Sequence, residues 1–110
     1  METKFTARHF KPHDGLREYA LDAMEKLERY YDGIVRSEIT LRFERVRNSV
    51  KIAEVHVTVY GTLLKAVEKT DEYHKSIDAA VIKLQRQLER YKDKLHNKSK
   101  TTVRKIREKD

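Results

Sequence analysis

Four cations at helical spacing are the residues in this sequence best placed to bind a ligand. Residues 72–96 contain no Gly or Pro, and this stretch includes Lys83, Arg86, Arg90 and Lys94. At about 100° per residue, these four positions fall between about 200° and 280° from Leu84 on a helical wheel. We call them the basic ridge. A row of Lys and Arg can neutralise the phosphates of a nucleic acid. A solvated helix flank better explains any one of these residues, but the four together favour nucleic-acid contact.

The overall charge of the chain favours the same class of partner. The 110 residues include 25 Lys and Arg against 18 Asp and Glu, a net charge of +7. Such an excess favours polyanions: RNA, DNA or an anionic membrane surface. Residues 1–70 carry 13 basic and 11 acidic residues, whereas residues 71–110 carry 12 and 7. The positive charge is therefore concentrated in the predicted last helix and the stretch after it.

Residues for catalysis or metal binding do not cluster in the sequence. The five His occupy different predicted elements, and Pro12 separates His9 from His13 in a loop, unlike zinc ligands on one helix face. The three Gly are isolated, which excludes a phosphate-binding Gly-rich loop. The chain has no Cys, so disulfides and cysteine nucleophiles are excluded. We expect no enzymatic activity, no metal and no cofactor.

Two absences bear on cellular location. The N-terminus lacks the apolar core of a signal peptide, and no apolar run approaches membrane-spanning length. The basic helix buries its only apolar face in the predicted core, which argues against binding to a membrane surface. We therefore expect a soluble, cytoplasmic protein that is a monomer in solution.

Apolar spacing predicts an α+β fold with the element order β-α-β-β-β-α. The predicted elements cover residues 3–9, 15–31, 35–44, 53–60, 63–69 and 72–96. His13 or Asp14 is expected to cap the first helix, and Thr70-Asp71 the second. Gly33 is expected to end the first helix in a left-handed conformation. Asn48-Ser49 would form the turn of a hairpin.

Both helices have one apolar face, and the simplest way to bury both is on the same face of a four-stranded sheet. The other face would then present Thr, Glu, Arg and Tyr to water. We expect residues 1–96 to form this domain. Residues 97–110 carry 6 basic and 2 acidic residues and predict a disordered or loosely helical tail. Cations at the hairpin tip and in the tail are secondary candidates for RNA contact: Arg45, Arg47, Lys51, Lys98 and Lys100.

Tyrosines are further candidates for RNA contact, because their rings can stack on bases. Tyr19, Tyr30 and Tyr91 occupy predicted core-facing positions, where packing explains them better. Tyr60 and Tyr73 lie at the ends of predicted elements and are less constrained.

Five segments together carry a resemblance to a known family. They are residues 16–19 (LREY), 26–32 (KLERYYD), 77–78 (ID), 83–88 (KLQRQL) and 91–95 (YKDKL). With the β-α-β-β-β-α order, the chain resembles the bacterial ribosome hibernation promoting factors and ribosome-associated translation inhibitors, in the short form. His13-Asp14 stands where the family often has Thr-Pro, and residues 72–74 (EYH) stand where relatives tend to have Asp-Met-Tyr. Neither departure touches the basic ridge.

The resemblance implies a protein that docks on the small ribosomal subunit and its rRNA, across the tRNA and mRNA sites, and holds the ribosome inactive. It also implies a fold similar to double-stranded-RNA-binding domains. Family members contact rRNA through basic residues of both helices, and the matching positions here are Arg17, Lys26, Arg29, Lys83, Arg86, Arg90 and Lys94. Long members carry a second domain, so the chain is either a short form or the N-terminal part of a longer protein.

Two other functions stay open on the sequence. A general structured-RNA-binding domain acting away from the ribosome would bind arbitrary RNA duplexes equally well. A protein-interaction module would bind its partner through an exposed sheet edge or the tail, and that binding would survive nuclease treatment and moderate salt.

Overall fold

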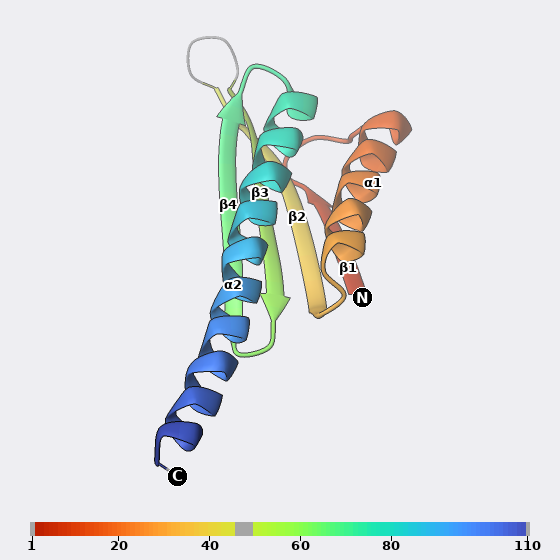
Figure 1. Ribbon diagram of the computed structural model, residues 1–110. Helices are drawn as coiled ribbons and strands as arrows, with labels where there is room; N and C mark the ends of the chain where they lie inside the picture. The colour runs from red at the N-terminus through yellow and green to blue at the C-terminus, as the bar shows by residue number, and fades with distance from the viewer. Residues whose placement is uncertain (1, 46–49, 110) are drawn as a thin grey trace.

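The computed structural model describes residues 2–45 and 50–109, and side chains as far as Leu95. Its elements are β1 (Glu2–Ala7), α1 (Asp14–Tyr30), β2 (Ile34–Glu44), β3 (Val50–Val59), β4 (Thr62–Thr70) and α2 (Tyr73–Lys109). The strands form one sheet in the order β1-β2-β3-β4, and both helices cover the same face of it (Figure 1). β1 is parallel to β2, and the other pairs are antiparallel. The predicted α+β class and element order are confirmed.

Several element boundaries differ from the prediction for local reasons. β1 ends at Ala7, and His9 adopts a positive φ of 66° that turns the chain toward α1. His13 is the N-cap of α1, and its Nδ1 accepts a hydrogen bond of 3.0 Å from the backbone N–H of Leu16. α2 begins at Tyr73 and continues through Lys109. The flexibility expected for residues 97–110 stays a prediction, as does the turn expected at residues 48–49, which lie outside the described residues.

The prediction for Gly33 was wrong. α1 ends at Tyr30 with Tyr31 as an extended C-cap (φ −145°), and Gly61 is the only described Gly with a positive φ. A Cβ at position 33 would lie 2.5 Å from Cζ of Tyr31. Gly33 therefore provides room for the Tyr31 ring, which packs edge-on against Tyr91 with 5.8 Å between ring centroids.

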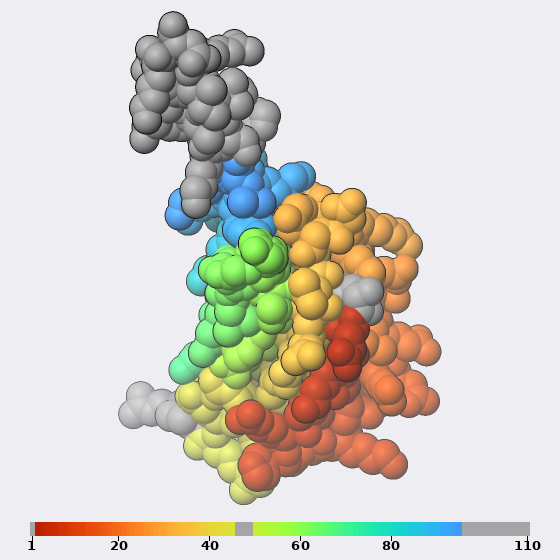
Figure 2. All heavy atoms as spheres, turned by 90° about the horizontal axis from the view of Figure 1, so that it is seen from below, coloured from red at the N-terminus to blue at the C-terminus, as the bar shows by residue number. Residues whose placement is uncertain are grey.

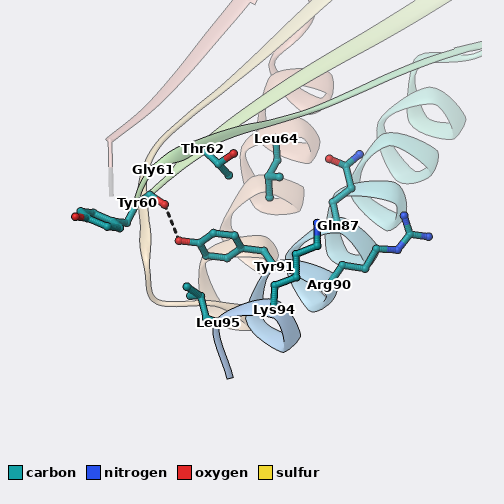
Figure 3. A pocket seen from close by; sticks show the side chains of 9 residues that line it. All are labelled: Tyr60, Gly61, Thr62, Leu64, Gln87, Arg90, Tyr91, Lys94 and Leu95. Carbon is teal, nitrogen blue, oxygen red and sulfur yellow. Dashed lines mark hydrogen bonds between the residues drawn. The ribbon is translucent and has the colours of Figure 1, made fainter. Parts of the chain in front are cut away.

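A two-residue turn, Tyr60-Gly61, joins β3 to β4 at the end where α2 leaves the sheet (Figure 3). Gly61 has a φ of +75°, as the third position of a type II turn requires. The Tyr91 hydroxyl of α2 donates a hydrogen bond of 2.7 Å to the Tyr60 carbonyl. In the space-filling view, the blue atoms of α2 lie beside the green atoms of this turn (Figure 2). The turn is therefore attached to the helix.

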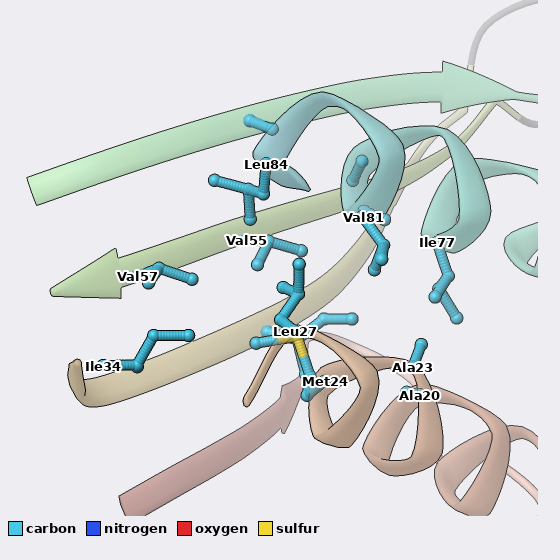
Figure 4. Packing of buried hydrophobic residues seen from close by; sticks show 14 of the residues in the cluster. Ala20, Ala23, Met24, Leu27, Ile34, Val55, Val57, Ile77, Val81 and Leu84 are labelled. Atoms are coloured by element: carbon cyan, nitrogen blue, oxygen red, sulfur yellow. The ribbon is translucent and has the colours of Figure 1, made fainter. Parts of the chain in front are cut away.

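The core lies between the helices and the sheet (Figure 4). α2 packs on β3 and β4, and α1 packs against α2, β1 and β2. Full burial of one large apolar side chain contributes about 1.5–3 kcal/mol to the stability of the fold. The large, fully buried core residues are Met24, Leu27, Ile39, Leu41, Val55, Val57, Ile77, Leu84 and Leu88.

A polar contact fixes the start of α2 on the sheet. Ser76 is fully buried, and its hydroxyl donates a hydrogen bond of 2.8 Å to the Lys51 carbonyl of β3. Its oxygen also lies 2.7 Å from Oγ1 of Thr70, the last residue of β4. Because a buried hydroxyl needs such partners, these contacts define where the helix begins.

The sheet face opposite the helices, here called the open sheet face, is less exposed than the sequence suggested. Thr40 and Ile52 lie on it and are nevertheless buried. An ion pair between Lys69 and Glu44, with 3.1 Å from Nζ to Oε1, joins β4 to β2 on the side of β3 where Ile52 lies. Long charged side chains cover apolar surface with their methylene groups, which explains the burial of Ile52.

Candidate nucleic-acid interface

The structure brings the basic ridge together along the side of α2 that borders β4. Lys83 forms an ion pair with Glu68 of β4, and Nε2 of Gln87 donates a hydrogen bond of 2.9 Å to the Lys65 carbonyl. Arg90 and Lys94 lie farther along the same side, beside the β3–β4 turn (Figure 3). The other side of α2 contacts α1, so Lys83, Arg90 and Lys94 face away from that helix.

The four ridge cations are not equivalent. Lys83 is partly neutralised by Glu68, whose side chain is only 20% exposed. Arg86, Arg90 and Lys94 are exposed, and no ion pair with another described side chain occupies them. These three cations are available to phosphates without first breaking an internal contact.

The predicted cations of α1 lie on a different helix from the basic ridge and have other neighbours. Lys26 borders the groove between the two helices, with Gln85 of α2 on the other side. Arg17 lies on the β1 side of α1, near Phe5 and Phe10. Arg29 forms an exposed ion pair of 3.1 Å with Glu25. The structure therefore does not join these residues to the ridge in one patch.

The two helices also differ in charge. α1 has five acidic and three basic residues. In contrast, α2 has six basic and three acidic residues between Tyr73 and Leu95. The surface of α2 is therefore the stronger candidate for contact with a polyanion.

The secondary candidates fall into two groups. Lys51 lies over the rings of Phe43 and Tyr73, with Nζ 5.7 and 5.5 Å from their centroids. Arg45 lies 5.8 Å from the Phe43 centroid. These cation–π contacts already occupy both side chains. Arg47 lies outside the described residues, as do the side chains of Lys98 and Lys100.

The division of the tyrosines into packed and exposed residues differs from the prediction. Tyr73 stacks on Phe10 with 5.1 Å between centroids and donates a hydrogen bond to the Arg42 carbonyl, so it belongs to the packed interior. Tyr30, expected in the core, is 39% exposed and lies under Lys92, whose Nζ is 5.1 Å from the ring centroid. Tyr60 is 87% exposed, as its place at an element end suggested.

Burial or hydrogen bonding raises the pKa of three tyrosine hydroxyls, those of Tyr19, Tyr31 and Tyr73. The hydrogen bond from Tyr19 to Asp78, which links α1 to α2, raises the pKa of Tyr19, and partial burial adds to the rise. Partial burial, together with the neighbouring Tyr91 hydroxyl, raises the pKa of Tyr31. The Tyr19 hydroxyl acts as a structural donor from α1 to α2.

Sequence reasoning missed a hollow of about 440 Å³ between the β3–β4 turn and α2. Thr62 and Leu64 line it from β4, and Arg90, Tyr91 and Lys94 line it from α2. No local pattern could have indicated it, because it depends on a turn and a helix about thirty residues apart in sequence, as the Tyr91–Tyr60 contact is.

Two further observations concern the part of the chain that the structure describes. None of its helices is long and apolar enough to cross a membrane. No three of its His, Asp and Glu side chains are grouped so that they could hold a metal ion.

Residues 3–96 match the family described as "Sigma 54 modulation protein / S30EA ribosomal protein". The chain belongs to this family. The sequence-based resemblance is thereby confirmed, and the family description names a ribosomal protein and not an enzyme.

Individual members of the family agree with this assignment. The chain is 30% identical over 87 residues to a ribosome hibernation promotion factor of Staphylococcus aureus (strain COL), which covers 79% of this chain and 46% of the relative. The chain thus spans about half the length of this curated relative.

Two solved structures share the fold. A ribosomal subunit interface protein from Coxiella burnetii has a TM-score of 0.76 at 24% identity, covering 84% of this chain and 99% of that one. The N-terminal domain of Protein Y from Thermus thermophilus has a TM-score of 0.69 at 27% identity, covering 83% and 99%.

Proposed function

We propose that this protein binds the small ribosomal subunit through the basic ridge and blocks the tRNA and mRNA channel. Ribosomes occupied in this way would be held inactive. Family membership supports a ribosomal partner, and the names of the Staphylococcus and Coxiella relatives point to hibernation and to the subunit interface.

The observation that carries the proposal is a row of three exposed cations on α2 that form no ion pair with a described side chain, namely Arg86, Arg90 and Lys94. Binding of these side chains to rRNA phosphates would release counterions from the RNA, which gives an affinity that falls with salt. The shape of a folded RNA groove would select the site, since phosphates carry little sequence information. Inhibition then follows from occupancy alone and requires no catalysis.

The cations of α1 have a secondary place in this proposal. Arg17, Lys26 and Arg29 lie outside the ridge, and acidic residues surround them. We expect each to add less to ribosome binding than Arg86 or Arg90 does.

The test is co-sedimentation of the purified protein with small subunits and whole ribosomes. The double variant Arg86→Glu with Arg90→Glu should bind ribosomes with at least tenfold lower affinity, because two favourable phosphate contacts become repulsive. Bound wild-type protein should also be displaced by tRNA or mRNA. Circular dichroism and thermal unfolding of the variant should match those of the wild type, since both side chains are exposed.

A matched control separates the position of the charges from net charge. Arg8→Glu with Lys11→Glu makes the same change in net charge at exposed sites outside α2. This control should still co-sediment. If the two double variants bind equally well, or equally poorly, the ridge is not the docking surface.

The alternative functions give different results in the same experiment. A general structured-RNA-binding domain would bind an equal mass of unrelated RNA as well as it binds ribosomes. A protein-interaction module would stay bound to its partner after nuclease treatment.

A further inference from the structure

The hollow between the β3–β4 turn and α2, here called the turn hollow, lies at the end of the basic ridge (Figure 3). One part of its wall is apolar, formed by Leu64 and the ring of Tyr91. Another part carries two exposed cations, Arg90 and Lys94. An apolar wall beside positive charge suits a ligand that is flat and apolar at one end and anionic at the other.

The turn hollow is fixed in place by contacts on both of its sides. The Tyr91 hydroxyl holds the turn through the Tyr60 carbonyl at 2.7 Å, and the ring of Tyr31 packs against Tyr91. The two-residue loop with Gly61 at a φ of +75° leaves the turn little freedom. The Tyr60 side chain points away from the hollow (Figure 3), so this residue does not block the entrance. A ligand would enter a site that already has its shape.

Gln87 gives the wall a defined hydrogen-bonding group. Its Nε2 donates to the Lys65 carbonyl at 2.9 Å, which fixes which end of the amide is nitrogen. Gln87 lines the hollow, and its Oε1 is left as an acceptor with no partner among the described side chains. An exocyclic amino group or ring N–H of a nucleobase is a donor of the required kind.

We propose that the turn hollow binds one unstacked nucleotide of the bound RNA. Its base lies against Leu64 and Tyr91, and its phosphate lies on Arg90 and Lys94. The proposal rests on the proposed function, since it takes RNA to be the ligand of the ridge. Bases inside a duplex are stacked and cannot enter, so the hollow would recognise a bulge or a flipped base where the ridge alone recognises phosphates.

The experiment compares two RNA hairpins that differ by a single bulged adenosine, using the full chain. The wild type should bind the bulged hairpin about tenfold more tightly, as expected for one additional stacked base. Thr62→Tyr fills the hollow with a ring and should abolish this preference, leaving affinity for the unbulged hairpin unchanged. Gln87→Met, which removes the acceptor, should reduce the preference.

Leu63→Tyr is the matched control, because Leu63 is the next residue, points to the open sheet face and is 58% exposed. It should keep the full preference. Equal affinity of the wild type for both hairpins, or a preference that survives Thr62→Tyr, would overturn the proposal. Neither result would change the ribosome co-sedimentation of the Arg86 and Arg90 variants, so this proposal and the proposed function fail separately.

Discussion

At the scale of single residues, the neighbours of a charged side chain in the folded structure decide whether it is available to bind a ligand. Lys83 and Arg86 belong to the same ridge, yet Lys83 is paired with Glu68 whereas Arg86 has no described partner. Glu68 lies on the helix-facing side of β4, opposite Ala53 of β3. A helical wheel of α2 contains no information about that strand, so the sequence predicted four equal cations.

Glu54 provides a prediction about pH at this scale. Partial burial raises the pKa of Glu54, but the hydrogen bond and charge of Lys65, together with His56 and Arg42, outweigh burial, so its pKa lies below the usual value. A lowered pKa in the folded state stabilises the protein above the pKa of the unfolded chain. This stability is lost as the pH falls through the folded pKa. The stability difference between wild type and Glu54→Gln should therefore narrow as the pH falls from about 5.

Thermal unfolding at a series of pH values from 7 to 3 measures this difference. Glu2→Gln is a suitable control, because Glu2 forms a strongly exposed pair with Arg36 at 3.7 Å, and such pairs contribute little. If the stability difference between wild type and Glu54→Gln stays constant from pH 7 to pH 3, the lowered pKa of Glu54 is contradicted.

At the scale of secondary-structure elements, local sequence patterns predicted the type and order of the helices and strands. The alternation of apolar residues in β2 and β3, and the three-and-four spacing in α1 and α2, were enough for element order and for the shared helix face. Errors arose where one residue meets another element. The absence of a side chain at Gly33 leaves room for the Tyr31 ring. Tyr73 is held by its stack on Phe10 and its hydrogen bond to the Arg42 carbonyl. For the same reason the ridge could be predicted and the turn hollow could not.

Gly33→Ala tests the role assigned to that glycine. The new methyl group would meet the outer end of the Tyr31 ring and push it from Tyr91, so we expect a loss of about 1 kcal/mol in the free energy of unfolding. Urea denaturation measures the loss. In a Tyr31→Leu background the same substitution should cost much less, because the obstructing ring is gone. An equal cost in both backgrounds would indicate a backbone effect at position 33.

At the scale of the whole molecule, charge is divided among surfaces. Three cations of the open sheet face form pairs with carboxylates on that face: Arg36 with Glu2, Lys65 with Glu54, and Lys69 with Glu44. α1 has an acidic excess, and the described side chains of α2 have a basic excess that includes Arg86, Arg90 and Lys94. Composition alone predicted a basic protein, and only the fold separates the basic surface from the neutral one.

This division predicts how salt acts on binding. The logarithm of the affinity for an RNA hairpin should fall linearly with the logarithm of salt concentration, and removing one phosphate contact should reduce the slope by about one. Arg90→Gln should show this reduction in fluorescence anisotropy titrations across a salt series. Arg8→Gln should not, since Arg8 lies outside α2. Equal slopes for both variants would mean that RNA senses the net charge of the protein and not the ridge.

The ion pairs on the open sheet face also affect how the protein meets its partner. Because these charges cancel over a few ångströms, the open sheet face adds little to the field at a distance, whereas α2 has a basic excess and α1 an acidic one. The molecule therefore has an electric dipole moment across its helical layer. Near a polyanion this moment turns the molecule during diffusion, so that productive orientations occur more often among its collisions. Association is then fast in dilute buffer and slows as ions shorten the range of the field.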